Sequence, residues 1–107
     1  MAFQIIWSHT AVEDLKGIVQ YIALDDPDAA AKLADRMIQR LETASKLPFS
    51  NRIVPEKAEE PIRETILKPY RLIYQVDSNH NVIHILRIWH AACGMTGIDG
   101  FWSSTNW

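Results

Sequence analysis

Two consecutive apolar stripes at helical spacing constrain the fold of this chain more than any other feature. In each stripe the apolar residues recur three or four positions apart, the spacing that places side chains on one face of an α-helix. The first stripe consists of Val12, Leu15, Ile18, Val19 and Ile22. The second consists of Ala30, Leu33, Ala34, Met37, Ile38, Leu41 and Ala44. Because only a short link separates the two stripes, the sequence predicts a helical hairpin.

The residues at the start of each stripe predict how the helices are capped. Ser8 is a candidate N-cap of the first helix, and Thr10 with Glu13 forms a second candidate capping box. Asp26 followed by Pro27 predicts the start of the second helix. Asp is a favoured N-cap residue, and Pro fits the first helical turn.

Four segments rich in β-branched and aromatic residues predict strands over residues 3–7, 62–67, 70–76 and 82–89. A loop-rich connection over 49–61 precedes the second strand, and the polar run over 77–81 predicts a tight turn. The last strands carry apolar residues on both faces, which predicts a sheet covered on both sides. We therefore expect an α+β fold in the order β-α-α-β-β-β, with the helical hairpin packed on a mostly antiparallel sheet. Four aromatic residues are expected to pack within it: Trp7, Tyr21, Tyr74 and Trp89.

Length and composition predict one domain that functions in the cytoplasm. A chain of 107 residues fits a single domain, which we place over residues 1–92. Residues 93–107 form a tail rich in glycine and aromatic residues, for which a docking segment, a self-association segment and a non-native end are open interpretations. The single cysteine, Cys93, excludes an internal disulfide and suits a reducing compartment. The sequence shows neither a signal peptide nor an apolar run near the ~20 residues of a membrane span.

The charge balance argues against nucleic acid as the main partner. Eleven Lys and Arg against thirteen Asp and Glu give a net charge of −2. Proteins that bind nucleic acid usually carry a basic excess, because neutralising phosphates supplies most of their affinity. The histidines show no metal-binding spacing and no glycine-rich loop precedes a helix, so we expect neither a metal nor a cofactor.

Several short motifs, taken in order, resemble one known family. They are Trp7-Ser8, Asp14-Leu15, Tyr21-Ile22-Ala23, Asp25-Asp26-Pro27, Pro69-Tyr70-Arg71-Leu72-Ile73-Tyr74 and Trp89-His90. No single motif is specific, but their order and spacing over most of the chain resemble the ParE branch of the RelE/ParE superfamily. These are the small toxins of bacterial type II toxin–antitoxin systems.

The resemblance implies a toxin that acts by binding. ParE-type toxins, often called plasmid stabilisation proteins, are understood to inhibit DNA gyrase, and a cognate antitoxin neutralises them. The implied partners are therefore an antitoxin and gyrase, in a homodimer or in a hetero-oligomer with the antitoxin. A degenerate toxin that only binds its antitoxin is a further reading.

The ribonuclease relatives of the superfamily imply an alternative, a ribosome-dependent mRNA endonuclease. The positions that match their catalytic residues are Glu56, Arg71 and His90, as base, phosphate-stabilising cation and acid. In the competing structural interpretation, Glu56 forms an ion pair with Arg52, Arg63 or Arg71 and His90 merely ends the last strand.

A docking surface for the antitoxin or target is expected beside the first helix and on one sheet face. The candidate residues on the helix are Val12, Leu15 and Val19. On the predicted strands, Arg63, Arg71 and Arg87 are candidates if they converge on one sheet face; solvated or ion-paired arginines are the alternative.

Overall fold

A computed structural model describes residues 2–54 and 61–90 of the chain. Two helices, α1 (His9–Ala23) and α2 (Pro27–Lys46), follow the first strand, β1 (Gln4–Trp7). A single 3₁₀ turn at Pro48–Ser50 leads into a short strand, β2 (Arg52–Ile53). Three longer strands complete the fold: β3 (Ile62–Leu67), β4 (Tyr70–Asp77) and β5 (Val82–His90). Glu56 and the tail over 93–107 lie outside the described residues.

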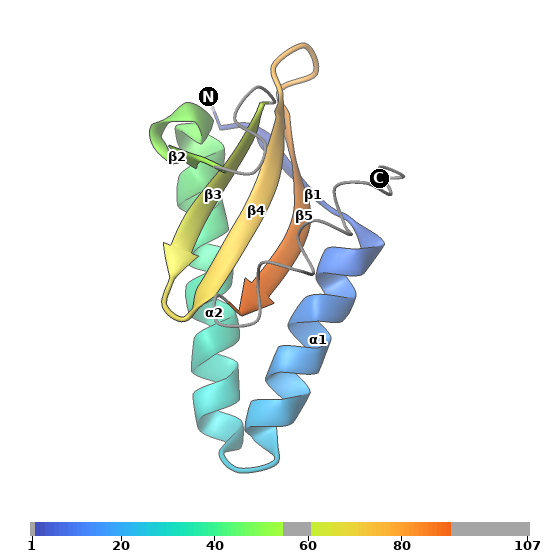
Figure 1. Cartoon of the computed structure of the whole chain (residues 1–107), viewed down its shortest axis with the longest axis vertical. Coiled ribbons are helices and arrows are strands. Elements are labelled where there is room, and N and C mark those ends of the chain that lie inside the picture. The colour runs from blue at the N-terminus through green and yellow to red at the C-terminus, as the bar shows by residue number, and fades with distance from the viewer. Residues whose placement is uncertain (1, 55–60, 91–107) are drawn as a thin grey trace.

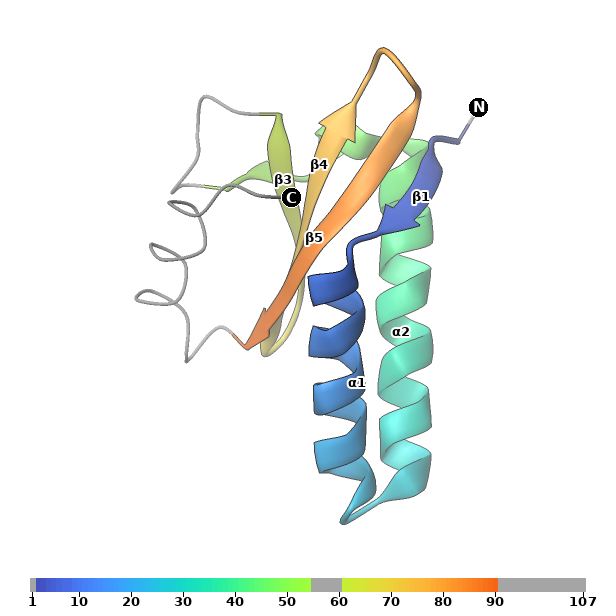
Figure 2. The same ribbon diagram turned by 90° about the vertical axis from the view of Figure 1, so that its right-hand side faces the viewer.

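The strands form one five-stranded sheet in the order β1-β5-β4-β3-β2. All neighbouring pairs are antiparallel except β1 and β5, which run parallel. The two helices lie side by side on one face of the sheet, and the tip of their hairpin extends beyond the end of the strands (Figure 1, Figure 2). The predicted α+β fold is confirmed, and β2 is an addition within the segment predicted to be loop.

Local side-chain hydrogen bonds fix the start of both helices. The Ser8 Oγ accepts a hydrogen bond from the Ala11 N–H at 3.0 Å, so Ser8 is the N-cap of α1. The Asp26 carboxylate accepts from the Ala29 N–H at 3.1 Å, and Pro27 occupies the first turn of α2. Both caps were predicted, and each contributes about 1 kcal/mol by satisfying an amide that the helix leaves without a partner. Ser8 fills the capping position, and Thr10 with Glu13 does not.

Buried apolar residues gather on both faces of the sheet. The face covered by the helices, here called the helix face, carries the larger cluster, which includes Met37, Leu41, Leu72, Tyr74 and Ile85. The opposite face, here called the outer face, carries a smaller cluster of Val54, Ile62, Ile73 and Leu86. The partly buried Trp7 packs against the first cluster and Trp89 against the second, as expected for both. Apolar strand residues on both faces are thus explained by burial on both faces.

One extra residue in β5 changes which side chains reach the core. Ile73 pairs with Arg87 and Tyr74 pairs with Ile85, so Leu86 forms a β-bulge. Strict alternation from Ile85 would place Arg87 on the helix face. The bulge instead brings Ile88 into the helix-face cluster and turns Arg87 away from it.

Candidate functional site

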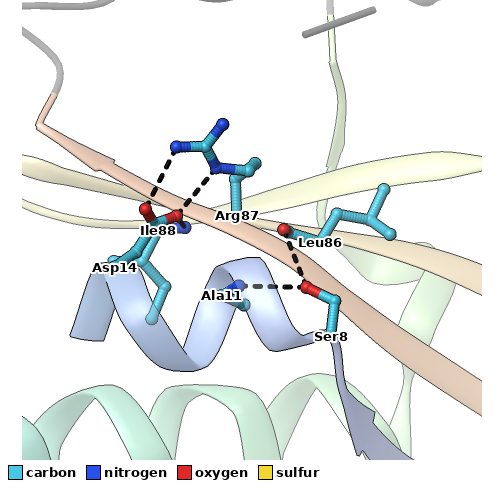
Figure 3. Close-up of polar contacts among 6 residues, drawn as sticks. All are labelled: Ser8, Ala11, Asp14, Leu86, Arg87 and Ile88. Atoms are coloured by element: carbon cyan, nitrogen blue, oxygen red, sulfur yellow. Dashed lines mark hydrogen bonds and ion pairs between the residues drawn. The ribbon is translucent and has the colours of Figure 1, made fainter. Parts of the chain in front are cut away.

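Helix α1 takes the place of a strand along the edge of β5. Strand β1 pairs with β5 only as far as Ile85, and the polar groups of β5 beyond that point need other partners. The Ser8 N–H donates to the Ile85 carbonyl at 2.9 Å, and the Ser8 Oγ donates to the Leu86 carbonyl at 3.1 Å. The Asp14 carboxylate accepts from the Ile88 N–H at 3.0 Å (Figure 3). Side chains of the cap and second turn of α1 thus continue the hydrogen bonding that β1 begins.

Asp14 also holds the guanidinium of Arg87. The Arg87 Nε donates to Asp14 Oδ2 at 2.8 Å and the Arg87 Nη2 donates to Asp14 Oδ1 at 3.0 Å (Figure 3). The guanidinium also lies 4.9 Å from the centre of the Trp89 ring, within range of a cation–π contact. A bidentate pair of this kind is geometrically specific, so it fixes the orientation of Arg87 on the sheet.

A second ion-pair group lies on the outer face of β3 and β4. The Glu64 side chain is fully buried and accepts from the Arg71 Nε at 2.6 Å. Its other oxygen forms an ion pair with Arg52 on β2. The Arg71 side chain is only 11% exposed, whereas that of Arg52 is 59% exposed. Glu64 therefore joins a buried and a solvated cation across three strands.

The two described residues of the proposed ribonuclease set, Arg71 and His90, project from opposite faces of the sheet. Arg71 lies opposite Trp89 in the register, and His90 lies opposite Tyr70. The His90 ring meets the Tyr70 ring edge-on, with centroids 5.4 Å apart, and Tyr70 packs against the helix-face cluster. Arg71 shares the outer face with Glu64 and Ile73, because side chains alternate along a strand.

Arg63, Arg71 and Arg87 do not all converge on one sheet face as expected: Arg71 and Arg87 share the outer face, each in an ion pair, and Arg63 does not. Arg63 lies opposite Tyr74, which belongs to the helix-face cluster, whereas Arg71 lies on the outer face. The Arg63 Nη1 donates to the carbonyls of Phe49 and Asn51 at 3.2 and 3.1 Å. Its guanidinium lies 5.1 Å from the centre of the Phe49 ring. Arg63 therefore ties the segment after α2 to β3.

Tyr74 anchors the same segment from within the core. Its hydroxyl donates to the Pro48 carbonyl at 2.6 Å and accepts from the Asn51 Nδ2 at 3.0 Å. Burial raises the pKa of this phenol above its ordinary value of 10.0, and the contacts with Asn51 and Arg63 oppose the rise. The expectation that Tyr74 is a packing residue is confirmed.

An open groove of about 500 Å³ lies between α1 and the ends of β4 and β5. The residues that line it include Glu13, Gly17, Ile18, Tyr21, Tyr70 and His90. Tyr21 is 78% exposed there, so the expectation that it is a packing residue is wrong. Tyr21 lies on the exposed side of α1, where its phenol can contact both apolar groups and water.

The predicted docking residues on α1 lie on other parts of the helix surface. Val12, Leu15 and Val19 are half-buried, and none of them is among the described residues that line the groove. Leu15 packs against the helix-face cluster. Gly17 lines the groove, and no atom lies within 4 Å of the position that a Cβ there would occupy.

The described part of the chain contains neither a metal-binding cluster nor a membrane-spanning helix. Residues 2–54 and 61–90 contain no group of three or more His, Cys, Asp and Glu side chains arranged to hold a metal ion. Within the same ranges, no helix has the length and apolar character needed to cross a membrane.

Comparison with known proteins identifies the family. A family model described as the ParE toxin of the type II toxin–antitoxin system parDE matches residues 5–93. The chain belongs to the ParE toxin family. It is a type II toxin–antitoxin toxin of the RelE/ParE superfamily, as its motifs indicated.

Relatives of this ParE-family chain cover most of its length. Toxin RelE2 from Caulobacter vibrioides is 30% identical over 89 residues, which are 83% of this chain and 96% of RelE2. A chain of the chromosomal ParDE system from P. aeruginosa has a TM-score of 0.67 at 22% identity, covering 83% of this chain and 96% of that one. A chain of the RelBE2 toxin–antitoxin complex from Mycobacterium tuberculosis has a TM-score of 0.61 at 20% identity, with coverages of 84% and 99%. At these identities the two solved structures show a shared fold.

Sequence reasoning missed the two carboxylates that organise the arginines, Asp14 and Glu64. Each had a signal in the sequence. Glu64 is a charged residue between Ile62 and Ile66 on the same face of a predicted buried strand. Asp14 lies one position before Leu15, within the first apolar stripe, and its carboxylate reaches β5. A lone charge in an apolar setting requires a partner, but the sequence does not say which one.

Proposed function

We propose that this toxin acts by binding DNA gyrase in the cytoplasm, without catalysing a reaction. One observation carries the proposal: Arg71 and His90 project from opposite faces of the sheet. A ribonuclease that uses 2′-hydroxyl attack needs a base, a phosphate-binding cation and an acid around one phosphate. A phosphate on the outer face near Arg71 is separated from His90 by the sheet itself.

The hydrogen bonds of Arg71 and Arg87 to carboxylates of this chain support the same proposal. A cation that stabilises a phosphate in a transition state must present its N–H donors to that phosphate. The Arg71 Nε donates to the buried Glu64, and the Arg87 Nε and Nη2 donate to Asp14. Both arginines therefore serve the fold through carboxylates of this chain. Membership of the ParE family points in the same direction.

Toxicity tests this proposal directly. We expect induction of the chain without antitoxin to activate a DNA-damage reporter early, while amino-acid incorporation continues. Glu56→Gln and His90→Gln are expected to leave both readouts unchanged, because neither side chain has a chemical role in binding gyrase. Early translation arrest with cleaved messages, abolished by either substitution, would show a ribonuclease instead. Normal growth with folded protein present would show a degenerate toxin that has lost its activity.

A cognate antitoxin is the second partner in this proposal. The related ParDE and RelBE2 structures are toxin–antitoxin systems. We place the antitoxin in the groove between α1 and the ends of β4 and β5, because it is open and carries the exposed Tyr21. An amphipathic helix fits such a groove by placing one apolar face in it.

Gly17 offers a way to block this groove without harming the toxin. Gly17→Leu places a side chain in open space, and it removes a glycine that lowers helix stability by about 1 kcal/mol relative to alanine. We expect the variant to be at least as stable as wild type in urea. In calorimetric titration with the cognate antitoxin, we expect its affinity to fall tenfold or more.

Gly17→Ala is the matched control, because it gives the same helix benefit with a much smaller side chain. Its affinity for the antitoxin is expected to stay within about threefold of wild type, a difference below 1 kcal/mol. Equal binding by wild type and Gly17→Leu would place the antitoxin on another surface.

A further inference from the structure

The exposed side of α2 is divided into a basic and an acidic row. Lys32, Arg36 and Arg40 recur every four residues and form the basic row. With a rise of 1.5 Å per residue, neighbouring members lie about 6 Å apart along the axis. The acidic row of Asp28, Asp35 and Glu42 recurs every seven residues on the adjoining part of the surface. All six residues are exposed.

A polar pocket opens where the basic row meets the sheet. It has a volume of about 220 Å³ and is lined by Arg36, Gln39, Arg40, Thr43 and Leu67. Two arginines line it, and no described carboxylate residue does. Among residues 2–54 and 61–90, neither Arg36 nor Arg40 has an ion-pair partner, which distinguishes them from Arg52, Arg71 and Arg87.

The backbone of β3 orients the Arg40 guanidinium before any ligand binds. The Arg40 Nη1 donates to the Ile66 carbonyl at 2.8 Å, which fixes the guanidinium against the end of β3. The remaining N–H groups of Arg40 are available to the pocket. A cation that is already oriented loses less conformational freedom when it binds an anion. Arg36 lies one turn away on the same side of α2 and supplies a second set of donors.

We propose that this pocket binds a carboxylate from an acidic peptide segment of a partner protein. Two guanidinium groups and the Gln39 amide offer the N–H donors that a carboxylate accepts, and Leu67 provides an apolar wall for its methylene groups. The acidic row restricts the site to a short acidic segment. Asp35 and Glu42 lie within a Debye length of the pocket and repel an extended polyanion such as nucleic acid.

The site is separate from the groove proposed for the antitoxin. It lies between α2 and β3, whereas the groove lies between α1 and the ends of β4 and β5. A binding assay on the purified toxin therefore tests the pocket whether or not the chain inhibits gyrase.

Calorimetric titration of the folded toxin with a hexaglutamate peptide in about 0.15 M salt tests the proposal. We expect saturable binding that Arg36→Gln weakens by about fivefold and Arg36→Gln/Arg40→Gln by tenfold or more, as the loss of charge-assisted hydrogen bonds predicts. Lys46→Gln is the matched control. It removes one positive charge from the same helix, about 9 Å along the axis from Arg40 and about 15 Å from Arg36. Both distances exceed the Debye length of about 8 Å at about 0.15 M salt, so the expected change in affinity is less than twofold.

Three results would overturn the proposal. The first is the absence of heat or saturation with wild-type toxin, and the second is an equal loss of affinity in Lys46→Gln and Arg36→Gln. The third is tighter binding of a single-stranded DNA oligonucleotide with a steep dependence on salt, which would make the row a nucleic-acid surface. Arg36→Gln leaves the Arg40 bond to Ile66 in place, so it keeps the test valid if the double variant loses stability.

Discussion

Replacing Glu64 by glutamine is expected to lower the free energy of unfolding by about 3 kcal/mol, a large part of the stability of a domain of this size. The substitution keeps the shape of the side chain but removes its charge. Arg71, with 11% of its side chain exposed, then loses a carboxylate that offsets the cost of burying its cation. Urea denaturation followed by circular dichroism measures the change.

Arg52, the solvent-exposed partner of Glu64, provides the control. Arg52→Gln removes a partner that is 59% exposed, so the expected loss is below about 1 kcal/mol. Glu64→Leu/Arg71→Met replaces the buried pair with apolar groups of similar size and is expected to return to within about 1 kcal/mol of wild type. If Glu64→Gln unfolds at the same urea concentration as wild type, the pair has no structural role.

The double variant also bears on function. It removes Arg71, a residue that a ribonuclease mechanism requires and that gyrase binding does not require for chemistry. If Glu64→Leu/Arg71→Met is folded and still activates the DNA-damage reporter, Arg71 serves the fold. If it is folded and harmless while the antitoxin still binds, Arg71 takes part in toxicity.

Asp14→Ala is expected to destabilise the toxin by about 2–3 kcal/mol, because hydrogen bonds to a charged group contribute more than neutral ones. The substitution removes the bidentate bond to Arg87 and the acceptor of the Ile88 N–H at one step. Both side chains of the pair are largely shielded, with 15% of Asp14 and 21% of Arg87 exposed. Hydrogen exchange should therefore accelerate at Ile88 and along α1 before the rest of the sheet.

The neighbouring carboxylate supplies the comparison. Glu13 is 53% exposed and faces solvent on the same helix, so Glu13→Ala is expected to change stability by less than about 0.5 kcal/mol. Equal destabilisation by Asp14→Ala and Glu13→Ala would mean that the contact between α1 and β5 does not depend on Asp14.

The parts of the fold that could be predicted are those that depend on neighbours in the sequence. The caps at Ser8 and Asp26, the two apolar stripes and the β4–β5 turn all depend on residues a few positions apart. The parallel pairing of β1 with β5 depends on residues at opposite ends of the described chain, and no local pattern contains it.

The three arginines expected on one sheet face do not all lie there, and the strand register explains why. In the register of β3 and β4, Arg71 lies opposite Ile66, and Ile66 is three residues from Arg63. An odd separation along a strand places two side chains on opposite faces. The bulge at Leu86 then places Arg87 on the outer face with Arg71, where strict alternation would have placed it on the helix face. One residue of register decides the outcome, and the sequence alone does not determine the register.

The pairing of β1 with β5 also determines when the five-stranded sheet of a newly made toxin can form. The Ser8 side chain, just after β1, bonds to a carbonyl 78 positions later in the chain. The helical hairpin can form soon after it is synthesised, but β1 has no strand to join until β5 has been made. Contacts this distant in sequence form slowly, because the chain loses loop entropy before the contact stabilises it. The surfaces that combine α1 with β5, including the groove proposed for the antitoxin, therefore do not exist on a growing chain until β5 has been made.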